Sequence, residues 1–250
     1  MSQLAAIVLT RNEARHIQDC LATLSFADQI IVFDSLSTDD TQRLARDAGA
    51  QVIEHPFQDY AHQRNAALEA SSADWVLFVD ADERVSEALA AEITRVLDAP
   101  QHTGYWIPRH NYIFGKLTRH TGWYPDYQMR LLHRDTARYD LTRPVHELVI
   151  LKNGEAGYFS EPLVHYNYDT VAQFHEKQRR YAAFDAHMLY KEGIRPKPYT
   201  PYTQAVRHFK WRFGDLHGYR DGWHGLRLSA LMAWYEYRKY RHLQDLWRAS

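Results

Sequence analysis

The sequence predicts an α/β protein whose N-terminal third folds as a mostly parallel sheet covered by helices. Continuously apolar runs of strand length alternate there with stretches of helical spacing, and short connections join them. Strands of this kind are buried on both faces, as in sheets built from strand–helix–strand units. The chain of 250 residues is 45% hydrophobic and 24% charged, a globular composition that argues against global disorder.

The expected elements follow one another regularly up to residue 80. Apolar runs of strand length occupy residues 4–9, 29–34, 51–54 and 75–79. Helices are expected after the first three of these strands: one capped by Asn12, one opened by residues 37–40 and one over residues 60–71.

The composition and pattern of the sequence change after about residue 100. Strands rich in aromatic residues are expected at residues 105–114, 127–133 and 157–168, with a long functional loop over residues 115–126. From Val171 the chain becomes helical, is broken by Pro196, Pro198 and Pro201, and ends in a helix over residues 223–247. We therefore expect one domain over residues 1–168, with halves at 1–100 and 101–168, and a helical region over residues 169–250.

Composition narrows the class of protein. A net charge of −1 disfavours a nucleic-acid binder, and one cysteine, Cys20, excludes an internal disulfide framework or a zinc site with several cysteines. No apolar run has the length of a signal peptide or of a membrane span. These observations predict a cytoplasmic protein.

The strongest local signal is the pair Asp80 and Asp82, separated by one alanine at the end of an apolar strand. Ligands of open α/β sheets bind beyond the carboxyl ends of the strands. Two carboxylates at such a place can share a hard cation with phosphate oxygens, so the pair predicts a metal site. The alternative is that Asp82 only favours the start of a helix.

Polar clusters also follow the other predicted strands. They are Thr10, Arg11, Asn12 and Glu13 after the first strand, Asp34 and Ser35 after the second, and Gln63, Arg64 and Asn65 in the helix that follows the third. Together they favour a nucleotide cleft, in which Asp34 accepts a hydrogen bond from a base or ribose and Arg64 meets a phosphate. Each cluster by itself is also compatible with a helix cap or a surface ion pair. No glycine-rich phosphate loop follows the first strand, which disfavours dinucleotide-binding and P-loop proteins.

These motifs resemble those of family 2 glycosyltransferases. The resemblance rests on residues 7–13, 32–41, 63–65 and 78–83, and it extends over nearly the whole chain through residues 124–131, 145–147, 165–166 and 221–222. Within the family, the chain is most similar to the small bacterial enzymes that add glucose to the lipopolysaccharide inner core. One departure is Ser35, because many members of the family carry a second aspartate after the one that corresponds to Asp34.

The resemblance implies a GT-A fold, which is Rossmann-like, with a mostly parallel central sheet flanked by helices. It also implies that a hexose, glucose before others, is moved with inversion from a UDP-sugar to a lipopolysaccharide inner-core saccharide or another lipid-linked acceptor. Residues 1–100 would then bind the nucleotide sugar and residues 101–168 the acceptor. A divalent cation, Mg²⁺ or Mn²⁺, would be the cofactor.

The same resemblance assigns roles to individual residues. The cation at Asp80 and Asp82 neutralises the leaving diphosphate, and His165 matches a downstream histidine that some GT-A enzymes add to the metal. Glu147 is expected to be the general base for the acceptor hydroxyl, with Asp126 as the alternative. The residues expected to bind the donor are Thr10, Arg11, Asn12, Glu13, Asp34, Arg64 and Asp80, and those expected to neutralise the diphosphate or a phosphorylated acceptor are Arg130, Lys177 and Arg180.

The C-terminal region differs in charge from the rest of the chain. Residues 204–250 carry nine Lys and Arg against four Asp and Glu, which is a net charge of +5. Aromatic rings and cations of the final helix favour a membrane interface, and they are Trp223, Trp234, Trp247, Arg227, Arg238, Arg241 and Arg248. We expect peripheral attachment to the inner face of the cytoplasmic membrane, and the alternative is a helix that packs on the catalytic domain.

Three other functions compete with this interpretation. A nucleotidyltransferase on a related sheet is disfavoured because its usual glycine-rich first loop is missing. A non-catalytic membrane-associated scaffold would keep the fold without the chemistry, and the intact Asp80 and Asp82 argue against it. A glycosyltransferase that acts on a different cell-surface polysaccharide precursor stays open.

Overall fold

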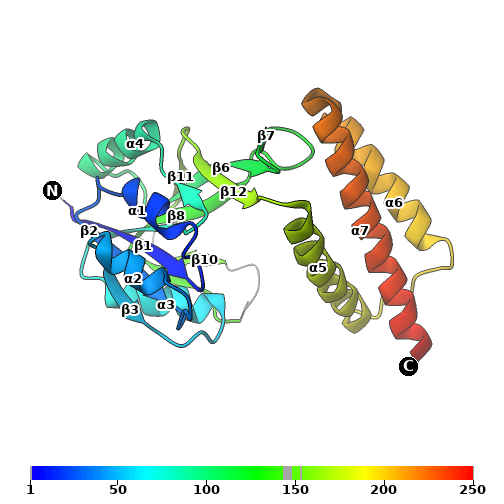
Figure 1. Cartoon of the computed structure of the whole chain (residues 1–250), viewed down its shortest axis with the longest axis horizontal. Helices are drawn as coiled ribbons and strands as arrows, with labels where there is room; N and C mark the ends of the chain where they lie inside the picture. The colour runs from blue at the N-terminus through cyan, green and yellow to red at the C-terminus, as the bar shows by residue number, and fades with distance from the viewer. Residues whose placement is uncertain (1, 143–147, 153, 250) are drawn as a thin grey trace. The chain divides into compact units, whose positions relative to one another are not determined.

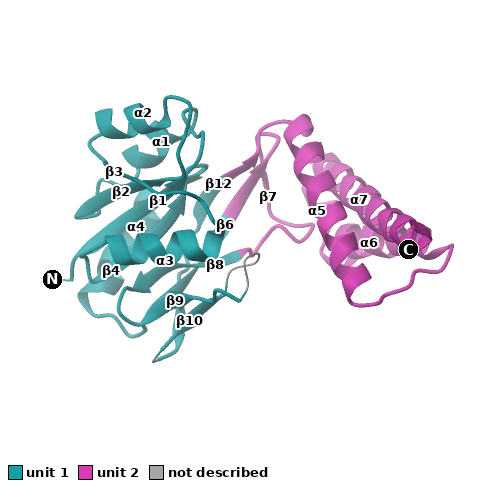
Figure 2. Ribbon diagram, turned by 90° about the horizontal axis from the view of Figure 1, so that it is seen from below, with its two compact units in different colours: residues 1–109, 127–165 teal, residues 110–126, 166–250 magenta. Residues whose placement is uncertain are grey.

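The computed structural model describes residues 2–142, 148–152 and 154–249. The chain forms two compact units, one of residues 1–109 and 127–165 (unit 1) and one of residues 110–126 and 166–250 (unit 2), shown in two colours in Figure 2. Strands β6 (Gly104–Ile113) and β12 (Leu163–Tyr168) each begin in unit 1 and end in unit 2.

Unit 1 is built on a large sheet (Figure 1). The other strands of this sheet in unit 1 are β1 (Leu4–Thr10), β2 (Gln29–Asp34), β3 (Gln51–Glu54), β4 (Trp75–Asp80), β5 (Glu83–Arg84), β8 (Tyr127–His133) and β11 (Ala156–Tyr158). Strands β9 (Ala137–Tyr139) and β10 (Val149–Leu151) pair with each other in a separate two-stranded sheet. The helices of unit 1 are α1 (Ile17–Ala22), α2 (Thr41–Asp47), α3 (Tyr60–Ala70) and α4 (Glu87–Asp98). The large sheet runs in the order β3-β2-β1-β4-β8-β6-β12-β5.

Strands β3, β2, β1 and β4 pair in parallel, whereas β8 is antiparallel to both β4 and β6. The sheet and its helices confirm the predicted fold class, a mixed α/β architecture of the GT-A kind. The strands predicted at residues 29–34, 51–54 and 127–133 have the predicted bounds. Their carboxyl ends bring Thr10, Asp34 and Asp80 to one edge of the sheet, where Thr10 lies opposite Asp34 in the register.

The parallel strands are buried on both faces because successive side chains point to opposite sides. On β1, Leu4, Ala6 and Val8 pack into a core with buried residues of α1, α2 and α4. Ala5 and Ile7 of the same strand pack on the other face, with buried residues of α3 and β9. The continuous apolar run at the start of the sequence is therefore shared between two cores.

Two expectations about helices are wrong. Asn12 does not cap α1, which begins at Ile17 with His16 as its N-cap. Asn12 has a φ of +58°, in the left-handed region that asparagine tolerates, and its side chain accepts a hydrogen bond from the Thr38 N–H (2.8 Å). Pro201 does not break the helical region but lies in the first turn of α6 (Thr200–Lys210), where its missing N–H removes no intrahelical bond.

Two strand boundaries also differ from expectation. The predicted strand at residues 157–168 is two strands, β11 and β12, and the predicted loop at residues 115–126 contains the short strand β7 (Lys116–Thr118). The break falls at residues 159–162, which include Pro162. Proline fixes φ and has no N–H for a strand ladder, so a continuous strand there is disfavoured.

Unit 2 contains three long helices, α5 (Val171–Lys191), α6 and α7 (Gly222–Ala249). Thr170 and Gln173 form a capping box at the start of α5. The core of the unit gathers aromatic and aliphatic side chains of several elements: Ile113, Tyr168, Phe174, Ala182, Leu228 and Tyr235. Among the described residues, no helix combines the length and the apolarity that crossing a bilayer requires.

Candidate active site

The ends of β1 and β2 are joined by one buried carboxylate. Asp34 has no exposed surface, and its oxygens accept hydrogen bonds from the Thr10 hydroxyl (3.0 Å), the Ser37 N–H (2.7 Å) and the Gln42 amide (3.0 Å). The Ser37 hydroxyl, 2.5 Å from Asp34 Oδ1, adds a fourth bond. Asp34 thereby fixes the two loops that follow the strands.

The loop after β1 is tied to the loop after β2 through backbone groups. The Asn12 N–H donates to the Ser37 hydroxyl (2.8 Å), and the Glu13 N–H donates to the Thr41 hydroxyl (2.8 Å). Arg11, which directly precedes Asn12 in the sequence, is exposed. The polar residues predicted at this sheet edge are therefore held in one structure, with Arg11 facing solvent.

Asp80, at the end of β4, is held by two arginines. Arg64 Nη2 and Arg130 Nη1 each lie 3.2 Å from Asp80 Oδ1, and Arg130 Nη2 donates to Oδ2. Loss of water around the carboxyl would by itself raise its pKa, but the Arg130 and Arg64 guanidiniums outweigh that effect and hold the pKa of Asp80 well below its ordinary value. Asp80 is thus a fixed carboxylate ion.

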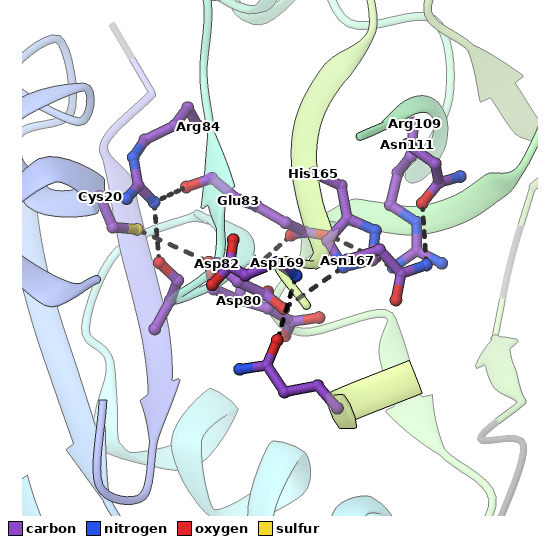
Figure 3. A network of polar contacts seen from close by, with 12 residues as sticks. Cys20, Asp80, Asp82, Glu83, Arg84, Arg109, Asn111, His165, Asn167 and Asp169 are labelled. Atoms are coloured by element: carbon purple, nitrogen blue, oxygen red, sulfur yellow. Dashed lines mark hydrogen bonds and ion pairs between the residues drawn. The ribbon is translucent and has the colours of Figure 1, made fainter. Parts of the chain in front are cut away.

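Glu83, which Figure 3 shows beside Asp80, forms the second half of this ion-pair network. Its side chain is fully buried, and Oε1 accepts hydrogen bonds from Arg130 (2.8 Å) and Arg109 (3.3 Å). Oε2 accepts the backbone N–H of Asp80 (2.9 Å). Glu83 therefore fixes both the turn after β4 and the side chain of Arg130, which binds Asp80.

Asp82 and His165 meet because β5 pairs with β12. In this antiparallel ladder His165 lies opposite Glu83, the neighbour of Asp82 in the sequence. His165 Nε2 lies 3.4 Å from Asp82 Oδ2, and the imidazole is 7% exposed while the carboxylate is 28% exposed. Figure 3 shows the two side chains beside Asp80 and Glu83. Two of the three predicted metal ligands are thus brought together.

These two side chains suit a divalent cation that also binds phosphate oxygens. Among the described residues, no group of three or more His, Cys, Asp and Glu side chains is arranged to hold a metal ion. Cations of nucleotide sites commonly take one or two protein ligands and complete their coordination with phosphate oxygens and water. A carboxylate with an imidazole nitrogen fits Mn²⁺ better than Mg²⁺, which prefers oxygen ligands. Asp80, occupied by two arginines, is the poorer ligand of the three.

Four predicted site residues remain. Asp126, Lys177 and Arg180 belong to unit 2, whereas the ion-pair network belongs to unit 1. Asp126 Oδ2 accepts a hydrogen bond from the Asn111 amide (3.1 Å), and Lys177 Nζ lies 5.1 Å from the centre of the Tyr168 ring. Arg180 is exposed. Glu147 lies outside the described residues.

Sequence reasoning did not assign a role to Glu83 or Arg109. Glu83 stands directly beside the Asp80–Asp82 pair, so its position was visible, but an acid after a strand end also fits the first turn of a helix. Arg109 lies within β6, where no sequence signal separates a buried ion pair from an exposed cation. Arg130, predicted to meet diphosphate, is 3% exposed and pairs with Asp80 and Glu83.

The fold and the site define an α/β protein of the GT-A kind, with a polar site at the carboxyl ends of its parallel strands. The family model described as glycosyl transferase family 2 matches residues 5–150. The chain belongs to this family and is a glycosyltransferase.

Similar proteins include a lipopolysaccharide core biosynthesis glycosyltransferase, LpsC, of Rhizobium meliloti (strain 1021). It is 29% identical over 249 residues, which cover 92% of this chain and 90% of the relative. An uncharacterized glycosyltransferase of Rickettsia bellii (strain RML369-C) is 26% identical, with 98% of this chain and 87% of the relative covered.

Solved structures with a partial likeness include glucosyl-3-phosphoglycerate synthase from Mycobacterium tuberculosis in complex with Mn²⁺, UDP and glucosyl-3-phosphoglycerate. Its TM-score is 0.48 at 17% identity, with 78% of this chain and 82% of that chain covered. For S. aureus TarS 1–349 in complex with UDP, the TM-score is 0.48 at 13% identity, with 99% and 91% covered.

Proposed function

We propose that this glycosyltransferase moves a hexose, with glucose as the first candidate, from a UDP-sugar to a lipopolysaccharide inner-core saccharide or another lipid-linked acceptor. The acceptor class is supported by the similarity to a lipopolysaccharide core glycosyltransferase over 92% of the chain. The observation that carries the chemistry is the pair of Asp82 and His165, 3.4 Å apart beside the fixed Asp80 carboxylate.

The proposed donor site is the sheet edge where β1, β2 and β4 end. A divalent cation held by Asp82 and His165 would supply positive charge against the departing diphosphate. The loop of residues 10–13 binds the nucleotide, with the exposed Arg11 toward phosphate. Asp34, whose oxygens already accept four hydrogen bonds, acts through the two loops that it holds.

Arg64 and Arg130 have a different role in this proposal from the one the sequence indicated. Because both guanidiniums bind Asp80, they fix the turn that carries Asp82 before any donor arrives. A site built in advance needs little reorganisation as charge develops on the leaving group. In this proposal, Arg64 and Arg130 therefore position the donor site and do not bind the diphosphate themselves.

The acceptor hydroxyl needs a base as it attacks the anomeric carbon. In an inverting transfer, the new C–O bond forms as the bond to UDP breaks, and the hydroxyl proton passes to a carboxylate. We assign that proton to Glu147 and keep Asp126 as the alternative.

The proposal is tested with the purified full-length protein, a panel of UDP-sugars and Mn²⁺ or Mg²⁺. We expect UDP binding and slow UDP release with one donor, UDP-glucose first, and loss of release in Asp82→Asn. Asp135→Asn is the matched control, since Asp135 has a side chain 70% exposed in unit 1. If the protein binds no UDP and releases none from any donor, the proposed enzymatic activity is contradicted and the non-catalytic scaffold is favoured.

The acceptor is tested in cells. Deletion of the gene should remove one hexose from the lipopolysaccharide core, measured by mass analysis. If the lipopolysaccharide core is unchanged and another surface polysaccharide is altered, the acceptor is another lipid-linked precursor and not the lipopolysaccharide core.

We further propose that unit 2 contacts the inner face of the cytoplasmic membrane. On α7, Trp223 is 80% exposed and Trp234 is 50% exposed, and α6 exposes Tyr202 (59%) and Val206 (70%). Exposed tryptophan rings favour the membrane–water interface, and nearby cations add attraction to anionic lipid. Such binding would bring the protein to an acceptor that is itself anchored in lipid.

Vesicle co-sedimentation tests this surface. Trp223→Ala with Trp234→Ala should bind phosphatidylglycerol vesicles more weakly than wild type at low salt, while Tyr60→Ala, which removes a ring 54% exposed in unit 1, should not. Equal binding by all three proteins would leave the helices without a membrane role.

A further inference from the structure

A small cavity lies between α5 and α7 in unit 2, with a volume of about 80 Å³. Its lining residues are Arg179, Ala182, Ala183, Tyr235, Arg238 and His242. The two alanines of α5 leave the space, because their side chains are too short to fill it. A single buried water needs only about 10–15 Å³, so the cavity has room for a small ion with water.

The cavity is lined by two exposed arginines and by a histidine with a buried ring nitrogen. Arg179 and Arg238 are both exposed, and within the described part of the chain neither makes an ion pair with a carboxylate. His242 Nε2 is buried and has no hydrogen-bond partner among these residues. Buried polar atoms are nearly always hydrogen-bonded, so an atom of this kind calls for an explanation such as an absent ligand.

The neighbouring acids of α7 do not neutralise the cavity. Glu236 pairs with Lys239 (2.8 Å) and Asp245 pairs with Arg248 (3.6 Å), each on the same helix. The Tyr235 hydroxyl is also occupied, since it donates to the His175 carbonyl and lies 2.6 Å from His175 Nδ1. The cavity therefore presents two guanidiniums and an imidazole nitrogen, with no acid among its lining residues.

We propose that this cavity binds a phosphate group. Two guanidiniums donate to phosphate oxygens in a fixed planar geometry, and charge-assisted bonds of this kind are strong. The imidazole adds a donor when its Nε2 carries the proton. The assignment of the phosphate to the acceptor rests on the proposed function, because a lipid-linked saccharide can carry it on a sugar or in its lipid headgroup.

The site is tested by titration of the full-length protein with inorganic phosphate at low ionic strength, with UDP and the diamagnetic ion Mg²⁺ present at saturation. The UDP occupies the donor site, so that phosphate reports on the cavity. We expect saturable binding that shifts the ring resonances of His242, assigned through His242→Gln. Arg179→Gln and Arg238→Gln should each weaken phosphate binding about tenfold or more.

The matched control is Arg207→Gln, which removes the same charge from an exposed position on α6. It should leave phosphate binding unchanged. Absence of saturable phosphate binding to wild type, or equal weakening in Arg207→Gln, would overturn the site. UDP binding is measured in the same samples, so failure of the donor site and failure of the cavity are distinguishable.

Two further probes identify the source of the phosphate. A hexose phosphate bound more weakly by Arg179→Gln and Arg238→Gln than by Arg207→Gln supports the site and assigns it to the saccharide. The same difference with glycerol phosphate, a soluble form of a lipid headgroup that presents no membrane surface, supports the site and assigns it to a headgroup. No difference with either probe would overturn the link to the acceptor.

Discussion

Replacement of Glu83 by glutamine tests how strongly the buried ion-pair network stabilises unit 1. The Glu83 carboxylate is fully buried and accepts hydrogen bonds from Arg130 (2.8 Å) and Arg109 (3.3 Å). The substitution removes one of the two carboxylates that face Arg130, and the other is Asp80. Removal of one partner from a buried ion pair leaves uncompensated charge and typically costs about 3–5 kcal/mol. We expect the free energy of unfolding to fall by about this amount.

The assay is equilibrium denaturation of the full chain, followed by the fluorescence of tryptophans, among them Trp75 in the core of unit 1. The control is Glu69→Gln, at an exposed position of α3, which should change the free energy by less than about 0.5 kcal/mol. In Glu83→Gln with Arg109→Gln, the losses should be less than additive, because the two residues are in contact. A loss below about 1 kcal/mol in Glu83→Gln would refute the reasoning.

Three further predictions address the reaction and the stability of unit 2. Glu147→Gln should keep UDP binding and lose about 10²–10⁴-fold in transfer rate, measured by UDP release; the same behaviour in Asp126→Asn instead would exchange the two roles. Asp82→Ala should abolish transfer and leave the circular dichroism spectrum unchanged, because its side chain lies at a strand end and 28% exposed; near-normal turnover with Mn²⁺ would remove Asp82 from the metal site. Loss of water around His224, reinforced by the charge of Lys116, holds the pKa of that imidazole below its ordinary value of 6.5. The unfolded state therefore binds more protons, so the stability of unit 2 should be complete above about pH 6.5 and fall as the pH is lowered, less steeply in His224→Gln; equal pH profiles in denaturation would contradict this.

Much of the sheet was predictable because its signals are local. The apolar runs that became β1, β2 and β4 are too continuous for half-exposed strands, and each ends in a polar residue. Helix starts were less predictable, because Asn12 and Pro201 each fit two structures. Asparagine both caps helices and adopts left-handed loops, and proline both breaks helices and opens them.

The site was predictable in its position and not in its pairings. The carboxyl ends of parallel strands meet at one edge, so the sequence indicates that Asp34 and Asp80 share it. The arginine side chain that neutralises Asp80 could not be predicted, because Arg130 lies on β8, a strand that pairs antiparallel with β4. Likewise Asp82 meets His165 through the ladder between β5 and β12. No spacing along the chain encodes contacts of this range.

That ladder also sets the order in which the site can be assembled. A contact between residues far apart in the sequence closes a long loop, which costs conformational entropy. Such contacts therefore tend to form late in folding. In a growing chain, β1 to β4 can pair while the turn with Asp82 still lacks its imidazole, since β12 must first be synthesised. A chain interrupted at residue 150, where the match to the family model ends, would carry the carboxylates without His165. The pair of Asp82 and His165 is therefore a late product of folding, and a nascent chain would complete it only after β12 has been synthesised.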